Sequence, residues 1–390
     1  MKARLLIAAL LSGAIAFGAA QKASAADDGI TIGMAVAFSG WMEAYDGEAT
    51  KMAQLWVDQT NAKGGLLGKQ IKVISGDTKT DRVEGAKVGK ALIDQGANLL
   101  LVSADYDYGA PAALQAQKAG VISTFLGVGP LSFTANNAGQ LEGAVMGDWG
   151  YEKKGFRKGY MLLDETIEYN KSVCAGYEWA FPNKGGTIVG KDTFKGLDPT
   201  ISSQITRLSD AIRSDGVDNI MLCSTNPGAA SSVRQLRAAG ITLPIMSATA
   251  MDGTYWLNST PGLKDFYLPV QALTVNDTRP PVNELTAEFA KKFGKPPTTQ
   301  YAYPIYAYLD LWSKAVTQAG TTDATKVVAL LNQTDKAPTI LGPRTFTPKL
   351  HIQTGMPMIV VSYADDKETP VEEWTIKDTI PDAVLYRLKK

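Results

Sequence analysis

Apolar residues recur with two different periods along this chain, and the two periods alternate. Every second residue from 30 to 38 is apolar, which predicts a strand with one apolar face. The next segment, 46–61, spaces its apolar residues three and four apart, which predicts an amphipathic helix. The same reasoning predicts strands at 70–75, 98–103 and 121–125, with helices at 83–95 and 111–119 between them. This β-α-β-α order favours a parallel sheet with helices on both faces.

A second series of the same kind begins after Tyr151. It predicts strands at 159–163, 187–190, 219–223 and 243–246, and helices at 170–181, 201–214 and 229–239. We therefore expect two doubly wound α/β units, with ligand bound between the carboxyl ends of their sheets. The remaining tail does not form a third domain of its own. It predicts helices at 282–293, 303–319 and 323–331, then strands at 357–363 and 372–376.

The first residues have the pattern of a secretory leader. Lys2 and Arg4 precede the apolar stretch 5–20, and Ala23-Ser24-Ala25 supplies small residues for cleavage before Ala26. The alternative is a membrane anchor, but the stretch is short for a span and is interrupted by serine and glycine. We expect 1–25 to be a signal peptide and the protein to be periplasmic.

The composition of the chain limits which partners and cofactors are expected. About 365 residues remain after cleavage, more than one core usually serves, so two domains are the default. The formal charge is zero, which gives no reason to expect nucleic acid or an anionic membrane as partner. One histidine and two cysteines offer little for a zinc site, and we expect no metal and no cofactor. Cys174 and Cys223 allow one disulfide in an oxidising compartment, but we expect two buried thiols.

Motifs of common catalytic chemistry are missing from the sequence. It contains no G-x-x-x-x-G-K-[ST] loop, no G-x-S-x-G elbow and no H-E-x-x-H. His351 is expected to be structural, and the segment 127–130 is expected to be a turn. Asp105 and Asp107 could serve an exported hydrolase as a carboxylate pair, although a solvated loop or ligand binding explains them equally well. We expect a protein that is not an enzyme.

Four segments at predicted strand ends are expected to meet at the cleft: 39–45, 104–108, 164–169 and 224–227. Helix N-termini and free backbone amides point to such an edge, so ligand contacts gather there. Aromatic residues in these loops are candidates for ligand contact: Trp41, Tyr45, Tyr106, Tyr108 and Tyr169. Aromatics within predicted helices are expected to be core packing instead, as for Trp56, Tyr308 and Trp312.

The segment 61–69, NAKGGLLGK, joins a predicted helix to a predicted strand. With Ser39-Gly40 before Tyr45, and Gly342 to Phe346 before His351, it resembles the periplasmic solute-binding proteins of the branched-chain amino acid type, which feed ABC importers. The resemblance covers nearly the whole mature chain. It implies the type I periplasmic binding protein fold, two lobes joined by three crossovers near 140, 274 and 344. Lobe 1 would comprise 26–140 plus 275–343, and lobe 2 would comprise 141–274 plus 344–390.

The resemblance also implies a ligand site. Trp41 and Tyr45 would line its first lip, and an acidic residue, best matched by Asp252, would hold an ammonium group. A ligand carboxylate would meet Ser103, Ala104 and Asp105. In the family an Ala-Thr pair completes these contacts to the ligand carboxylate. The pair falls at 127–129 in this chain and is represented by Val128. The second lobe would enclose the ligand with Tyr169 and Asn226. The helix that returns to the first lobe would contribute Tyr301.

This chain differs from the amino acid binders at the residues expected to contact the ligand carboxylate. Asp-Tyr-Asp-Tyr at 105–108 replaces small hydroxyl residues, the threonine of the Ala-Thr pair is absent, and the candidate loops contain no arginine. A ligand carboxylate beside Asp105 would be repelled. We therefore expect a monomer that clamps a small polar organic solute, aromatic or amine-bearing, and presents it to a membrane ABC permease. The alternatives are a sensor that delivers ligand to a membrane receptor, an exported hydrolase, or a scaffold without ligand.

Overall fold

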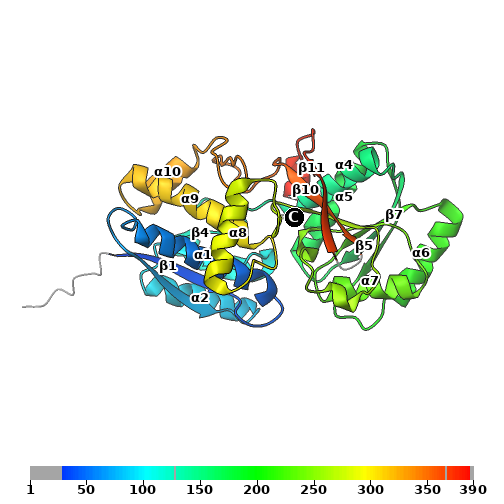
Figure 1. Cartoon of the computed structure of the whole chain (residues 1–390), viewed down its shortest axis with the longest axis horizontal. Helices are drawn as coiled ribbons and strands as arrows, with labels where there is room; N and C mark the ends of the chain where they lie inside the picture. The colour runs from blue at the N-terminus through cyan, green and yellow to red at the C-terminus, as the bar shows by residue number, and fades with distance from the viewer. Residues whose placement is uncertain (1–28, 127–128, 365–366, 387–390) are drawn as a thin grey trace, which may run out of the picture.

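The computed structural model describes residues 29–126, 129–364 and 367–386. The expected signal peptide and its cleavage site at Ala25/Ala26 therefore lie outside the described residues. The chain forms two α/β lobes side by side, each built around its own sheet (Figure 1). Within the described ranges, no helix combines the length and the apolar character that crossing a membrane requires.

The first lobe contains a four-stranded parallel sheet in the order β2-β1-β3-β4. The predicted β-α alternation is confirmed for this part of the chain. Its strands are β1 (Ile30–Val36), β2 (Ile71–Asp77), β3 (Leu99–Val102) and β4 (Ile122–Ser123). Its helices are α1 (Glu43–Ala62), α2 (Arg82–Asp94), α3 (Tyr106–Ala119), α8 (Pro280–Phe293), α9 (Ala302–Ala319) and α10 (Ala324–Leu331).

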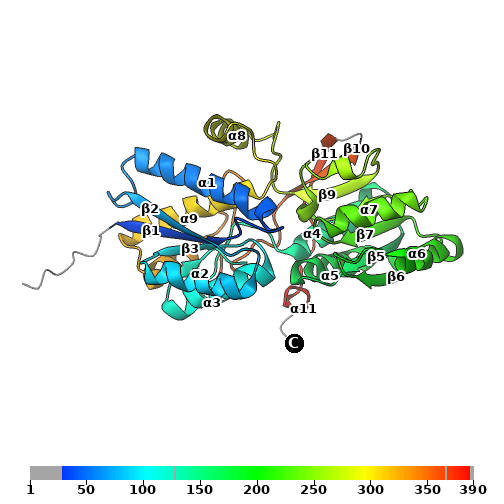
Figure 2. The same cartoon turned by 90° about the horizontal axis from the view of Figure 1, so that it is seen from below.

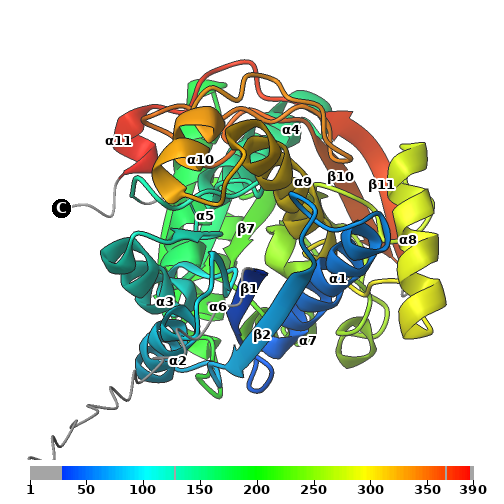
Figure 3. The ribbon, with the colours of Figure 1, turned by 90° about the vertical axis from the view of Figure 1, so that its left-hand side faces the viewer.

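Both faces of this sheet are covered by helices. Ile32 and Met34 pack in one core with α1 and α9, whereas Ala35 and Leu100 face a second core with α2 and α3. The two helical layers are visible on opposite sides of the strands (Figure 2, Figure 3). Because side chains alternate along a strand, the period-2 pattern read from residues 30–38 corresponds to the face under α1 and α9.

The second lobe contains a seven-stranded sheet in the order β11-β10-β9-β8-β7-β5-β6. The strands from β5 to β9 pair in parallel, and β10 and β11 extend the sheet as an antiparallel edge. Its strands are β5 (Lys158–Asp164), β6 (Thr187–Phe194), β7 (Asn219–Cys223), β8 (Ile245–Met246), β9 (Phe266–Val270), β10 (Met358–Ala364) and β11 (Lys367–Trp374). Its helices are α4 (Gly139–Lys153), α5 (Glu168–Asn183), α6 (Ser202–Asp215), α7 (Gly228–Ala238) and α11 (Asp382–Leu385).

The tail of the chain is shared between the lobes. Trp312 of α9 and Val327 of α10 belong to the same core as Ile32 of the first sheet. Val360 of β10 packs instead in a core of the second lobe. This arrangement is the one that the resemblance implies for the tail. The lobe boundaries near 140, 274 and 344 stay a prediction.

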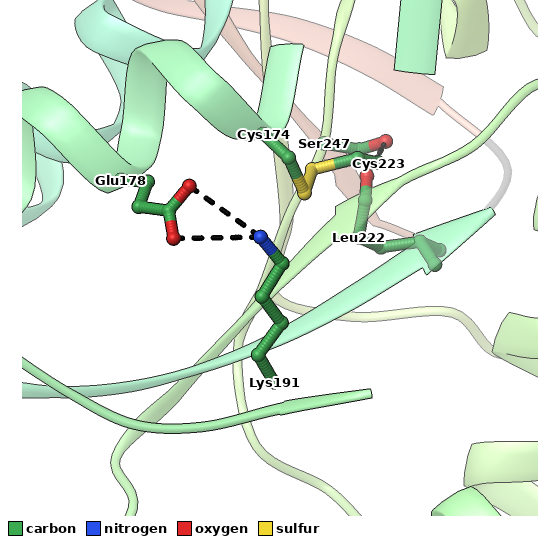
Figure 4. Close-up of a disulfide and its surroundings, with 6 residues drawn as sticks. All are labelled: Cys174, Glu178, Lys191, Leu222, Cys223 and Ser247. Atoms are coloured by element: carbon green, nitrogen blue, oxygen red, sulfur yellow. Dashed lines mark hydrogen bonds and ion pairs between the residues drawn. A yellow bond between two sulfur atoms is a disulfide. The ribbon is translucent and has the colours of Figure 1, made fainter. Parts of the chain in front are cut away.

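Cys174 and Cys223 form a disulfide, so the expectation of two buried thiols is wrong. The helical and strand positions predicted for them are correct. However, α5 packs directly over β7, which brings the two Cα atoms to 5.7 Å, a normal separation for a disulfide. Figure 4 shows the bridge between helix and strand, beside the Glu178–Lys191 ion pair. Sequence spacing alone could not reveal this contact, because the two cysteines are 49 residues apart.

Candidate ligand-binding site

A small pocket lies between the lobes, at the carboxyl ends of the sheets. The first lobe supplies the start of α1, the β3–α3 junction and the residue before α9. The second lobe supplies the start of α5, the loop after β7 and a short 3₁₀ turn, Thr249–Met251. The lining residues are Trp41, Met42, Tyr45, Ala104, Asp105, Tyr169, Thr225, Ala250 and Tyr301. Six of them are residues that the sequence placed at the site.

Aromatic rings form much of the wall. Tyr45 meets Tyr301 edge to face with centroids 5.4 Å apart, and Trp41 meets Tyr45 in the same way at 6.1 Å. These tyrosines are not loop residues as predicted. Because α1 begins at Glu43, Tyr45 lies in its first helical turn, and Tyr169 lies likewise at the start of α5. Edge-to-face packing fixes the orientation of these rings in the pocket wall.

Two of the five candidate aromatics do not line the pocket. Tyr106 and Tyr108 lie in α3, which begins at Tyr106 and not at the predicted residue 111. Tyr106 accepts a long hydrogen bond of 3.5 Å from the backbone of Gly139. Tyr108 packs behind the lip against Trp41, with ring centroids 5.5 Å apart. Both rings therefore support the site without bordering it.

A line of hydrogen bonds crosses from one lobe to the other at the backbone of Ala250. Tyr45 donates its hydroxyl to the Ala250 carbonyl at 3.0 Å, and the Ala250 amide donates to the Tyr169 hydroxyl at 3.2 Å. Tyr169 in turn donates to the carboxylate of Glu142. Since Tyr45 belongs to the first lobe and Ala250 to the second, this contact holds the lobes together in the described conformation.

Glu142 of α4 anchors the end of that line. Its carboxylate also accepts from the Asn137 side chain at 2.7 Å and from the Thr249 amide at 2.9 Å. Burial raises the pKa of Glu142, while its hydrogen bonds act in the opposite direction. Glu142 was not among the predicted site residues, because the helix that carries it was not predicted.

Asp46 is buried behind the pocket, where it organises the first lobe. Its Oδ1 accepts from the Ala104 amide at 3.1 Å, and its Oδ2 accepts from the Ala37 amide at 2.9 Å. Burial raises the pKa of Asp46 to about 6. Ser103, predicted to meet a ligand, is also buried and does not line the pocket. The amide of Ala104 is thus already bound to a carboxylate of the protein itself.

Asp105 and Asp107 have structural partners. Asp105 caps α3, accepting from the amides of Asp107 at 2.8 Å and Tyr108 at 3.1 Å. Burial, and next the charge of Asp107, raise the pKa of Asp105 to about 7. Asp107 pairs with Arg82 and accepts from the backbone of Glu168 at 2.8 Å. A hydrolytic carboxylate pair needs both groups within reach of substrate, and these contacts occupy both oxygens of Asp107.

The other expected site residues lie near the pocket but do not line it. Asn226 follows the lining residue Thr225, and its side chain donates to Tyr255 at 3.2 Å. Asp252 is buried and accepts from the Gln300 amide, and burial raises its pKa well above the ordinary value. Val128 lies outside the described residues.

Three lining residues were not predicted as site residues: Met42, Thr225 and Ala250. Each adjoins a predicted segment or residue, but nothing in its side-chain chemistry distinguishes it. Ala250 contributes through its backbone, which no residue-type argument can detect. As for metals, the described part of the chain holds no cluster of three or more His, Cys, Asp or Glu side chains placed to bind one. His351 is buried and stacks on Phe133 with centroids 3.7 Å apart, as a structural residue does.

The comparisons with known proteins agree with this architecture. A family model described as periplasmic binding protein matches residues 29–368. Leu/Ile/Val-binding protein homolog 2 of Brucella abortus (strain 2308) is 24% identical over 370 residues, which cover 90% of this chain and 93% of the relative. LivJ, the branched-chain amino acid transporter substrate binding protein of Streptococcus pneumoniae, was solved in complex with isoleucine. Its TM-score is 0.78 at 23% identity, covering 89% of this chain and 100% of LivJ.

A second solved structure carries a different ligand. It is a solute binding protein of an ABC transporter from Rhodopseudomonas palustris BisB5 in complex with 3,4-dihydroxybenzoic acid. Its TM-score is 0.74 at 17% identity, covering 91% of this chain and 99% of that protein. The chain belongs to the periplasmic binding protein family. It has the type I fold of the substrate-binding proteins that serve ABC importers, which confirms the resemblance drawn from the sequence.

Proposed function

We propose that the protein is exported, with 1–25 removed, and acts as a monomer that captures a small polar organic solute between its lobes. We favour an aromatic or amine-bearing solute over a branched-chain amino acid. Contacts from both lobes favour the closed form, and a membrane permease then receives the solute. Binding without turnover is the role of the family, and the structural contacts of Asp105 and Asp107 argue against a hydrolase.

The main support for this class of solute is the hydrogen bond between the Ala104 amide and the Asp46 carboxylate. An amino acid binder of this family needs free donors at the β3–α3 junction to hold the ligand carboxylate. Here the Ala104 amide donates to Asp46 at 3.1 Å instead. A second carboxylate at this position would meet the charge of Asp46 and of Asp105, both buried. A solute carboxylate is therefore disfavoured at this end of the pocket.

The charges around the cleft favour a cation or a hydrogen-bond donor. Asp105 lines the pocket, Asp252 and Glu142 lie behind it, and the described lining contains no lysine or arginine. A buried carboxylate is stabilised by an opposite charge within a few ångströms. The faces of Trp41 and the tyrosines suit either an aromatic ring or an ammonium group. An arylalkyl amine satisfies both the aromatic wall and the carboxylates.

A thermal-shift screen across aromatic acids, amines, amides and amino acids tests this proposal. A solute that binds only the folded state raises the melting temperature. We expect aromatic amines to raise it and leucine, isoleucine and valine to leave it unchanged. A shift produced by branched-chain amino acids alone would contradict the proposed solute class. Incubation of the protein with its best ligand should return that ligand unaltered by mass spectrometry, and a product would identify an enzyme.

A further inference from the structure

A second and larger cavity lies in the first lobe, behind the cleft pocket. It lies between the first sheet, α1 and α9. Ala104 and Tyr301 line both this cavity, called here the inner chamber, and the cleft pocket. The two spaces are therefore neighbours across a shared wall, and only the cleft pocket corresponds to the site expected from the sequence.

Most of the inner chamber is apolar. Met34 and Leu101 face it from the sheet, and Pro304 and Ile305 face it from α9. In sequence these positions have the pattern of ordinary core. A chamber of this lining favours apolar groups such as an aromatic ring or a short alkyl chain, because removing apolar surface from water is favourable.

One polar group of the chamber wall lacks a partner. The hydroxyl of Tyr308 is buried and makes no hydrogen bond within the described residues, and the whole side chain is 1% exposed. Two threonine hydroxyls of the wall have internal partners. Thr50 donates to the Asp46 carbonyl at 2.7 Å, and Thr124 accepts from the Val102 amide at 3.1 Å. An unsatisfied buried hydroxyl is unfavourable, so a polar group that reached Tyr308 from the chamber would be stabilised.

We propose that the inner chamber is a second part of the solute site and that the solute is elongated. Its ammonium head would lie in the cleft beside Asp105. Its apolar tail would pass Ala104 and Tyr301 into the chamber, where a hydroxyl at the far end would bond Tyr308. This inference rests on the proposed function and specifies its solute class as arylalkyl amines with a polar substituent on the ring.

Titration calorimetry with two matched series tests the length requirement. The probes are benzylamine, 2-phenylethylamine, 3-phenylpropylamine and 4-phenylbutylamine, with the corresponding phenylalkanoic acids in parallel. Each methylene that enters the chamber should raise the affinity of the amines about fourfold, from about 0.8 kcal/mol per buried methylene. A ring hydroxyl in the para position should strengthen binding of the longest amines further.

Three variants, one of them a control, test whether the gain in affinity arises in the inner chamber. Ala49 of α1 lines the chamber, so Ala49→Phe should abolish the gain with length. Ala62→Phe, which adds the same ring at the exposed end of the same helix, is the matched control and should keep the gain. Tyr308→Phe should remove only the gain from the para hydroxyl. Melting temperatures of all three variants establish that they fold.

Xenon binding separates this inference from the proposed function. A xenon-pressurised crystal of the wild-type protein should show xenon in the chamber, and the Ala49→Phe crystal should not, because apolar cavities bind this gas without any transport role. Absence of xenon in the wild type, or affinity that fails to rise with length in both series, would overturn the inner chamber as a solute site. Length-dependent binding of the acids alone would instead keep the chamber and contradict the proposed amine head.

Discussion

The carboxylate of Asp107 in the first lobe accepts a hydrogen bond from the backbone amide of Glu168 in the second lobe, with 2.8 Å between the two atoms. Glu168 begins α5, and Ile167 before it offers no side-chain cap. The first amides of a helix have no partner within the helix, so a carboxylate there is favoured by both hydrogen bonding and the helix dipole. Asp107 therefore caps α5 from across the cleft, and the cap exists only while the lobes are close.

Asp107→Ala should favour the open form. A lost N-cap costs about 1 kcal/mol, so the affinity for the solute should fall roughly fivefold, because closure is coupled to binding. Calorimetry measures the affinity, and small-angle scattering of the solute-free protein measures the fraction of open molecules. Asp94→Ala is the control, because Asp94 forms an exposed ion pair with Lys90 on α2. Equal affinity in wild type and Asp107→Ala would show that the cap does not stabilise closure.

Tyr169 and Asn226 are expected to act on binding and not on folding. Tyr169→Phe removes the hydroxyl that joins the Ala250 amide to buried Glu142, so affinity should fall roughly tenfold. Asn226→Ala removes the hydrogen bond to Tyr255, which lies beside Tyr45. A hydrogen bond of this kind contributes about 1 kcal/mol, so binding should weaken several-fold. Thermal melts of both variants should stay within a few degrees of the wild type. Unchanged affinity in both would remove these residues from the site.

The disulfide should stabilise the second lobe without affecting the solute. Closing a loop between Cys174 and Cys223 restricts the unfolded chain and contributes about 2–4 kcal/mol to the free energy of unfolding. The double variant Cys174→Ala, Cys223→Ala should therefore unfold at lower urea concentration. Neither cysteine lines the cleft pocket, so calorimetry should give the wild-type affinity. Identical urea midpoints for wild type with and without a reducing agent would show that the bond adds no stability.

Regular patterns made most of the fold predictable, and two elements show where that approach fails. Helix α4 was not predicted because it contains several glycines, which disfavour helix, and is buried on all sides. Its glycines are needed for contact with α5, since a Cβ on Gly143 would lie 1.8 Å from the Val173 carbonyl oxygen. Strand β9 was not predicted either, since Pro269 within it argues against a strand by sequence criteria.

The site was less accessible to sequence reasoning than the fold. Residues following predicted strands, such as Ala104 and Tyr169, were found because the carboxyl ends of parallel strands share an edge. The roles of Asp46 and Glu142 depend on which backbone amides fold against them, and no local pattern encodes that. Tyr308 has the sequence pattern of an ordinary core residue, and only the tertiary packing shows that its hydroxyl has no partner.

Asp105 should make both stability and amine binding depend on pH. Burial raises its pKa from 3.8 to about 7, so the folded state holds the proton more tightly than the unfolded chain does. The stabilisation this provides is fully present below pH 3.8 and is lost as the pH rises to about 7. Asp105→Asn keeps an N-cap on α3 but cannot titrate, so its melting temperature should fall less than that of the wild type across this range.

Protonation of Asp105 should also control the affinity for the solute. An ammonium group favours the ionised carboxylate, so the affinity of the wild type for 3-phenylpropylamine should rise as the pH increases through about 7, the pKa of Asp105. In Asp105→Asn the affinity should be lower and should change less with pH across the same interval, where only the more distant Asp46, with its pKa raised to about 6, still titrates beside the pocket. Calorimetry at several pH values in one buffer series measures both. A wild-type affinity that stays constant, or falls with rising pH, would place the ammonium group away from Asp105.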